Sequence, residues 1–218
     1  MPSPIDHFVW GTPDLSEGCA YIEKEFGIAP EPGGTHPGLG TCNALLSLGA
    51  DQYLEIMAPK DPPPQSVGAR LAALPEPGLV TWVVRRSDLS QLADKIEQNE
   101  FGIARSGPVK TERLTPVGDL LSWELLFLTG HPYAGLLPFF IDWQDTPHPS
   151  RSTPLGGAVV DFSIQSRSAT SLNPILSGLD TTETAIVADA DALALRIRAP
   201  AGAVELNSTP QTISILGM

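Results

Sequence analysis

The sequence contains little that would point to a metal–thiolate site or to a nucleic-acid partner. Only two of its 218 residues are cysteines, Cys19 and Cys42, and their spacing fits neither a zinc site nor a disulfide framework. Basic residues number 13 against 25 acidic ones, which leaves a formal net charge of −12. Because no basic stripe is present to neutralise phosphates, we expect neither nucleic acid nor an anionic membrane surface as a partner.

Long apolar runs are missing as well. The longest, such as AGLLPFFI, fall far short of the roughly 20 residues that a membrane helix needs. The first residues lack the charged and apolar regions of a signal peptide, so we expect a cytoplasmic protein. No G-x-S-x-G nucleophile elbow occurs and neither cysteine has an evident activating base, which argues against covalent catalysis.

One passage of the sequence occurs twice. PDLSEGCAYIEKEFGIAP, which starts at Pro13, resembles SDLSQLADKIEQNEFGIAR, which starts at Ser87. Asp14 and Asp88 are 74 positions apart, and the phenylalanines near the other ends, Phe26 and Phe101, are 75 apart. Matches at both ends of the passage indicate an internal repeat.

Each copy of the passage predicts a strand followed by a helix of about three turns. Asp14 and Asp88 fit the N-cap position, since each has a Glu or Gln three residues later. Gly27 and Gly102 fit the position just past a helix end. The 22 prolines and 20 glycines favour short strands and many loops around these helices.

Apolar stretches after each helix predict three further strands per unit, and GGTHPGLGT reads as a tight loop between the first helix and the next strand. We therefore expect an α+β protein built from repeated βαβββ modules. The modules are predicted at 1–60 and 78–146, with a weaker third at 155–210. Together they would form one or two compact domains.

Three motifs together resemble a known family. IDHFVWGTPDL, GGTHPGLGTCNALLSLG and YLEIMAP, in this order, are similar to the glyoxalase-like domain proteins of the vicinal oxygen chelate superfamily. That superfamily includes glyoxalase I, extradiol dioxygenases and bleomycin-resistance proteins, and the pattern covers residues 4 to about 145. The resemblance implies that two modules pair into a curved, open barrel of mixed β-sheet, either within the chain or across a homodimer.

The resemblance also implies a metal site inside the barrel, held by the first and last strands of each module. By position, the ligands would be His7 and Glu55 from the first module, and Asp142 if FIDWQ is matched to YLEIM. Thr81 stands where a second histidine would be. This oxygen-rich set suits Mn²⁺, Mg²⁺, Fe²⁺ or Ni²⁺ better than Zn²⁺. Glu205 could add a carboxylate if the third module folds back over the barrel.

The residues of the first strand admit a simpler interpretation too. Strand alternation places His7 on one face with Ile5 and Val9, and a lone histidine on an apolar face is more often a hydrogen-bonded core residue than a ligand. Glu55 is the stronger candidate, because a carboxylate among apolar neighbours is costly unless it is paired or ligating. Asp6 would point to the opposite face, toward solvent or a helix.

Other candidates lie in loops and on strands of the second module. His36, in the glycine-rich loop, is a candidate for a general acid/base or a substrate hydrogen-bonder, or else stabilises the turn. Trp82 and Trp143 are candidates for the substrate pocket, although most such tryptophans are core residues. His131 and His148, in proline- and glycine-rich loops, are expected at the surface.

Two functions of different classes follow from the resemblance. In the first, a small oxygen-bearing substrate binds a divalent metal, Glu55 or Asp142 moves a carbon-bound proton, and His7 ligates while His36 orients the substrate. Such an enzyme would be a lyase, an isomerase or a dioxygenase. In the second, the protein only sequesters a small molecule, an alternative that the missing ligand at Thr81 favours.

Overall fold

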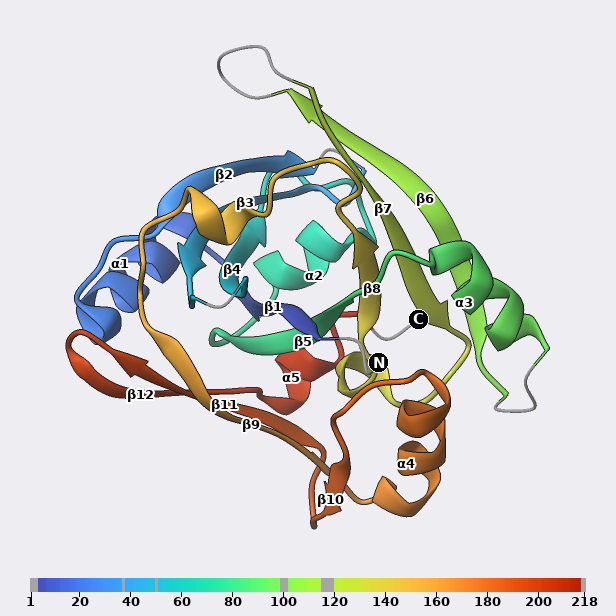
Figure 1. Cartoon of the computed structure of the whole chain (residues 1–218). Coiled ribbons are helices and arrows are strands. Elements are labelled where there is room, and N and C mark those ends of the chain that lie inside the picture. The colour runs from blue at the N-terminus through green and yellow to red at the C-terminus, as the bar shows by residue number, and fades with distance from the viewer. Residues whose placement is uncertain (1–3, 37, 50, 99–101, 115–119, 217–218) are drawn as a thin grey trace.

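The computed structural model describes residues 4–36, 38–49, 51–98, 102–114 and 120–216 of the chain. Its larger sheet has eight strands in the order β2-β3-β4-β1-β5-β8-β7-β6. The strands are β1 (Ile5–Gly11), β2 (Glu31–His36), β3 (Thr41–Ser47), β4 (Tyr53–Pro59), β5 (Gly78–Arg85), β6 (Ala104–Leu114), β7 (Leu120–Thr129) and β8 (Phe139–Asp142). Figure 1 shows this sheet strongly curled. The predicted α+β class and the curved, open sheet are confirmed.

The eight strands divide into two halves with the same ladder. β1 runs parallel to β4 in the first half and β5 runs parallel to β8 in the second, while β1 and β5 pair antiparallel at the centre. The central register is symmetric: His7 pairs with Val83, and Val9 pairs with Thr81. The two modules are therefore joined within the chain, edge to edge.

A β-bulge occurs at the same place in both central strands. Ile5 pairs with Val84 and His7 with Val83, so that Asp6 is the extra residue on β1. The shift between Val9 and Trp10 likewise leaves Val80 as the extra residue on β5. Because a bulge turns the strand locally, the alternation of faces breaks at Asp6. Ile5 joins the core on the convex face, whereas Val9 packs on the concave face.

The described part of the chain has five α-helices beside the strands: α1 (Leu15–Phe26), α2 (Val67–Ala72), α3 (Leu89–Glu97), α4 (Ala169–Gly178) and α5 (Pro210–Ile213). Within the described residues, none is long and apolar enough to cross a membrane. Asp14 caps α1 as expected, since its carboxylate accepts a hydrogen bond from the backbone N–H of Glu17 at 2.9 Å, and Gly27 ends that helix with φ 76°.

Asp88 is at the N-cap position of α3, as predicted, but the expected capping hydrogen bond is not made. The Asp88 carboxylate makes no hydrogen bond to the start of α3. It instead accepts two hydrogen bonds from the Arg86 guanidinium, at 2.6 and 2.7 Å, a charge-assisted bidentate pair that competes with the backbone amides. The helix ends at Glu97, before Gly102. Phe101 lies outside the described residues.

The glycine-rich segment of the first module is also not the loop that was expected. Gly33, Gly34 and His36 belong to the edge strand β2, which pairs antiparallel with β3. A side chain at Gly33 would stand 2.3 Å from the Asn43 Oδ1 atom. Glycine here lets the edge strand approach a polar side chain of β3, rather than forming a turn.

The third region forms a separate sheet of four strands in the order β10-β9-β11-β12. The strands are β9 (Ala158–Ser166), β10 (Ala185–Val187), β11 (Ala192–Ala199) and β12 (Gly202–Asn207). A strand, a helix and three strands follow one another as in the first two modules. The pairing differs, because β9 lies between β10 and β11 instead of beside the last strand. This region is not a third copy of the same ladder.

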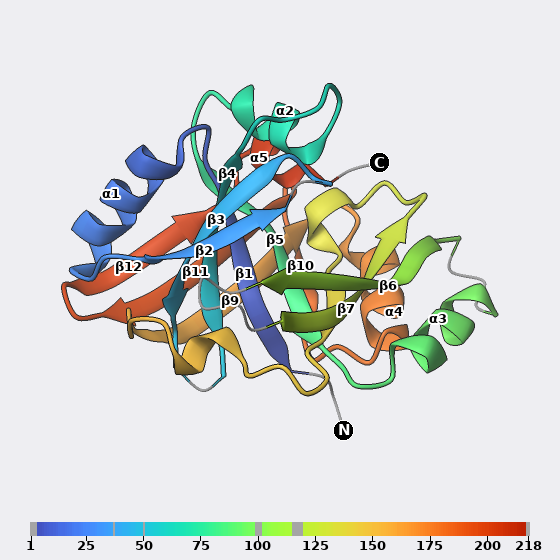
Figure 2. The same ribbon diagram turned by 90° about the horizontal axis from the view of Figure 1, so that it is seen from above.

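The four-stranded sheet covers the convex face of the larger sheet, and α1 and α3 lie at opposite ends of the molecule (Figures 1 and 2). Phe162 of β9 packs on Phe8 and Trp82, with ring centroids 5.0 and 5.6 Å apart. The concave face has a smaller apolar cluster, into which α2 contributes Val67 and Leu71. The convex core thus positions β1 and β5, whose other faces line the concavity.

We predict that Phe8→Ala lowers the free energy of unfolding by about 3–5 kcal/mol, because Phe8 is fully buried between the two sheets. Urea denaturation followed by tryptophan fluorescence and by circular dichroism measures this change. Val187→Ala, at a side chain that is 79% exposed, is the control and should change stability by less than about 0.5 kcal/mol. A loss below 1 kcal/mol for Phe8→Ala would contradict the shared core.

Candidate functional site

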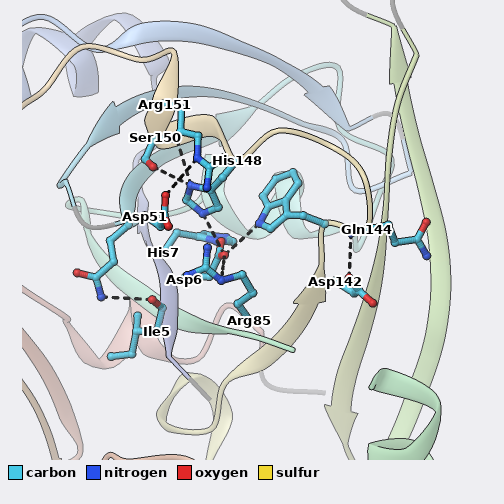
Figure 3. A network of polar contacts seen from close by, with 12 residues as sticks. Ile5, Asp6, His7, Asp51, Arg85, Asp142, Gln144, His148, Ser150 and Arg151 are labelled. Atoms are coloured by element: carbon cyan, nitrogen blue, oxygen red, sulfur yellow. Dashed lines mark hydrogen bonds and ion pairs between the residues drawn. The ribbon is translucent and has the colours of Figure 1, made fainter. Parts of the chain in front are cut away.

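A buried carboxylate, Asp6, is the centre of the largest polar cluster that Figure 3 draws. Its side chain is 0% exposed. Oδ1 lies 2.7 Å from His7 Nδ1, while Oδ2 lies 3.0 Å from His148 Nε2 and accepts a hydrogen bond from Trp143 Nε1 at 3.0 Å. The Arg85 Nε atom is 3.8 Å away. The bulge explains this burial, because it turns Asp6 to the side of the sheet where these partners lie.

Asp6 is held in its charged form. Burial alone would raise its pKa, but the hydrogen bonds with His148 and His7 oppose burial, and the pKa is held well below its ordinary value. An ionised carboxylate is only an acceptor, so the proton in each histidine contact belongs to the imidazole. We therefore assign a proton to His7 Nδ1 and to His148 Nε2.

The other nitrogen of His7 faces Glu55. His7 Nε2 and Glu55 Oε2 are 3.6 Å apart, which is longer than a hydrogen bond. Both side chains are nearly covered, with 3% of His7 and 6% of Glu55 exposed. The parallel ladder of β1 and β4 creates this contact, since Tyr53 pairs with His7 and Glu55 with Val9.

Asn43 of β3 orients the Glu55 carboxylate. Its amide Nδ2 donates to Glu55 Oε1 at 2.6 Å, and its Oδ1 accepts from the backbone N–H of Gly34 at 2.7 Å. Both ends of the amide are thereby engaged, which fixes its orientation. Only Oε2 of Glu55 is left to face His7. Because Gly33 has no side chain, β2 lies close enough to Asn43 for the backbone N–H of Gly34 to reach it.

Aromatic rings enclose the His7 imidazole. Tyr53 stacks on one side of it at 4.4 Å between ring centroids, and Phe139 meets it edge-on at 5.9 Å. Trp143, which follows β8, lies 5.7 Å from His148 and 5.5 Å from Trp123. The site is therefore a short polar chain, Asp6–His7–Glu55, inside an apolar wall.

Two predicted substrate-binding residues lie elsewhere. Trp82 is fully buried on the convex face, where its Nε1 donates to the Leu136 carbonyl at 3.0 Å; it alternates with Thr81 along β5 and faces away from the concavity. His36 is on the concave face at the end of β2, where its Nδ1 lies 3.0 Å from Thr41 Oγ1 instead of reaching Glu55. Trp143, in contrast, lies at the site.

Asp142 is not brought to His7 and Glu55. Val83 pairs with Phe139, so the ladder puts Phe139 in the position that corresponds to Glu55. Asp142 alternates with Ile141 and points away from the concave face. Its Oδ1 accepts from the backbone N–H of Gln144 at 2.8 Å, and Figure 3 shows it apart from the cluster. The sequence match of FIDWQ with YLEIM was wrong by three residues.

Glu205 is also distant from the concavity in the fold. It is exposed on β12, opposite Arg196 of β11, in the sheet that covers the convex face. The third region covers the back of the larger sheet instead of folding over its concave side. Glu205 is therefore unable to serve as a further ligand beside Glu55.

His148 and Asp6 are the site residues that the sequence did not reveal. His148 was expected at the surface but is buried, with Nε2 on Asp6 and Nδ1 2.8 Å from Ser150 Oγ. Asp6 was expected to face solvent or a helix. The only available signal for His148 was its place between two prolines in TPHPS, which restricts the backbone on both sides. His131 is half-buried, and burial lowers its pKa.

The donor set does not fit the divalent metal that the resemblance implies. His7 Nε2 and Glu55 Oε2 are two donors, and the corresponding positions of the second module are Thr81 and Phe139. The carboxylate oxygens of Asp6 and both ring nitrogens of His148 are already engaged in hydrogen bonds within the protein. Among the described residues, no three His, Cys, Asp or Glu side chains come together as a metal would require.

Comparisons with known proteins identify the fold. A model of the glyoxalase-like domain matches residues 5–179. A hypothetical protein from Staphylococcus aureus, 16% identical, superposes with a TM-score of 0.62 over 93% of this chain and 84% of that one. Methylmalonyl-CoA epimerase from Mycobacterium tuberculosis, 19% identical, gives a TM-score of 0.47 over 68% and 91%. No curated protein matches the sequence.

We predict that Asp6→Asn lowers the free energy of unfolding by about 3 kcal/mol at neutral pH, because the amide places donors against imidazole and indole N–H groups. Since the native pKa of Asp6 is lowered, its ionised form stabilises the fold above about pH 4 and loses this effect as the pH falls. Urea denaturation at pH 7 and at lower pH tests both statements.

Asp161→Asn is the matched control for Asp6→Asn. Asp161 is about half exposed and pairs with Arg196 at 3.2 Å, so its loss should cost no more than about 1 kcal/mol. Equal losses of stability for the two variants would show that Asp6 is not an integral part of the buried cluster.

Proposed function

The chain belongs to the glyoxalase-like domain family, and on that premise we propose that it binds a small oxygen-bearing organic molecule beside His7 and Glu55 and transfers a proton there. The concave sheet face is the binding surface. The reaction class is the movement of a proton on a carbon next to a carbonyl group, as an isomerase or a lyase requires. The fold alone does not establish this activity, so the proposal rests on the residues at the site.

One observation supports the proposal above others. With its proton on Nδ1 and held by Asp6, the His7 ring presents Nε2 as an acceptor toward Glu55. Glu55 Oε2 is an acceptor as well, and the atoms face one another at 3.6 Å. Two buried acceptors at that distance are unfavourable unless a donor lies between them. A hydroxyl group of a ligand, about 2.8 Å from either atom, would donate its one hydrogen to one of the two acceptors and relieve their unfavourable contact.

The proposed chemistry assigns a role to each group. Glu55 takes a proton from the carbon beside the ligand's carbonyl, and the electron pair of that C–H bond moves to the carbonyl oxygen. His7 Nε2 takes the proton of the ligand's hydroxyl group and passes it to this carbonyl oxygen, and Asp6 stabilises the imidazolium that exists between these two transfers. Asn43 holds the second oxygen of Glu55, so that Oε2 keeps its orientation.

We expect the protein to catalyse exchange of the carbon-bound hydrogens of an α-hydroxyketone with heavy water, and Glu55→Gln to slow that exchange at least about 100-fold. Proton NMR of hydroxyacetone and of phenacyl alcohol measures the exchange, after subtraction of the buffer rate. Glu205→Gln, an exposed glutamate on β12, is the matched control and should exchange at the wild-type rate. Equal rates for all three proteins would overturn the proton-transfer role.

A second candidate is a protein that binds such a molecule without converting it. The polar residues of the first module have apolar or weakly polar counterparts in the second, Val80, Thr81 and Phe139. Of the four ligand positions that the resemblance implies, only the two in the first module therefore carry residues able to bind a metal. Binding of phenacyl alcohol without any hydrogen exchange, lost in Glu55→Gln, would select this candidate. Cytoplasmic location and a homodimer stay predictions, and neither is needed to form the site.

Metal content gives a separate test of the cofactor. Because the described donors amount to one histidine and one carboxylate, we expect purified protein to hold no stoichiometric Mn, Mg, Fe, Ni or Zn. Elemental analysis of the wild type and of the His7→Ala/Glu55→Ala double variant should then give the same low values. A stoichiometric metal in the wild type that is lost in the double variant would restore the metal-dependent reaction.

A further inference from the structure

The two modules present chemically different surfaces at equivalent positions. The symmetric ladder of β1 with β5 matches Asp6 and His7 to Val80 and Thr81, and the outer ladders match Glu55 to Phe139. Both bulges are kept, so the backbone is alike at these equivalent positions. The side chains there differ. The concave face is therefore divided into a polar half on β1 and β4 and an apolar half on β5, β8 and β7.

The apolar half is not fully covered. Side chains on its concave side that keep part of their surface exposed are Leu121, Leu125, Phe127, Phe139 and Trp143. Phe127 packs on Phe139 at 5.1 Å between ring centroids, and Phe139 reaches the edge of the His7 ring at 5.9 Å. Partly exposed aromatic side chains that adjoin a buried polar pair are typical of a binding surface for an apolar group.

The charges beside the cluster argue against a phosphate-bearing ligand. Figure 3 draws two arginines next to Asp6 and His148. Arg85 directs its Nε toward Asp6 at 3.8 Å, and Arg151 pairs with Asp51 at 3.3 Å. Both cations thus have a carboxylate beside them already, and the formal net charge of the chain is −12. A multiply charged anion would therefore meet the repulsion of a strongly acidic chain.

From this division we infer that the ligand class is a neutral α-oxygenated ketone with a flat apolar group, whose oxygens face His7 and Glu55 and whose apolar group lies on Phe139. The inference rests on the proposed function and specifies its ligand. Phe139 is the residue that determines specificity, because it contacts the His7 ring and occupies the position where the other module carries Glu55. A ligand held at His7 Nε2 extends onto that ring.

Binding of two ketones that differ only in the apolar group tests the inference. Hydroxyacetone carries a methyl group and phenacyl alcohol a phenyl group on the same hydroxyketone, and calorimetry gives both affinities. We expect the wild type to bind phenacyl alcohol at least about tenfold more tightly, since burying a phenyl group stabilises the complex. In Phe139→Ala the ratio should fall to about 1–3, while hydroxyacetone affinity changes little.

Further variants separate folding from recognition. Phe139→Leu keeps an apolar side chain and should retain part of the preference, and thermal melting shows whether each variant is folded. Leu155→Ala, at a side chain that is 62% exposed, is the control and should keep the wild-type ratio. Equal affinities of the wild type for the two ketones, or an unchanged ratio in folded Phe139→Ala or Phe139→Leu, would overturn the inference.

The same measurements distinguish failure of the inference from failure of the proposed function. Equal binding of both ketones that is lost in Glu55→Gln would overturn only the apolar preference. Binding of neither ketone at millimolar concentration, or binding that Glu55→Gln leaves unchanged, would overturn the proposed function itself. A phenyl preference lost in Phe139→Ala, with affinity for both ketones lost in Glu55→Gln, supports both.

Discussion

The site depends on the hydrogen bonds of one ionised carboxylate, that of Asp6, which is buried on the side of the sheet where His7, Trp143 and His148 lie. It accepts hydrogen bonds from His7 on the same strand and from Trp143 and His148, more than 130 positions later in the chain. A buried carboxylate without such partners would cost several kcal/mol, about 3–5 when one partner of a buried pair is removed. The three donors offset that cost, and in doing so they orient the His7 ring toward Glu55.

The two modules share the bulged central strand, but only the first module has the buried carboxylate and its histidine neighbour. Both central strands have a bulge at the equivalent position, yet one bulged residue is Asp6 and the other is Val80. The bulge is therefore common to both modules, whereas Asp6, His7 and Glu55 belong to the first module alone. Phe139 in place of a second carboxylate extends the same asymmetry across the concave face. The second half of the barrel supplies shape and apolar contact, and the first half supplies the proton-bearing groups.

Much of the architecture could be predicted from the sequence because it rests on local patterns. The repeated passage predicted both modules, and the resemblance to glyoxalase-like proteins predicted the curved sheet and the His7–Glu55 pair, which the structure places 3.6 Å apart. Other features depend on register and tertiary contacts. A single bulge reversed the expected direction of Asp6, and a gap of three residues separated Asp142 from the true counterpart of Glu55. His148 was missed because its partner is distant in sequence.

Asp6 orients His7 so that its Nε2 faces Glu55 and, in the proposed function, a ligand. Long-range ¹⁵N–¹H NMR of the four histidine side chains reports on this orientation. We expect a proton on Nδ1 of His7, a proton on Nε2 of His148, and a change at His7 Nε2 when phenacyl alcohol is added. A proton on Nε2 alone of His7, with no response to the ketone, would contradict it.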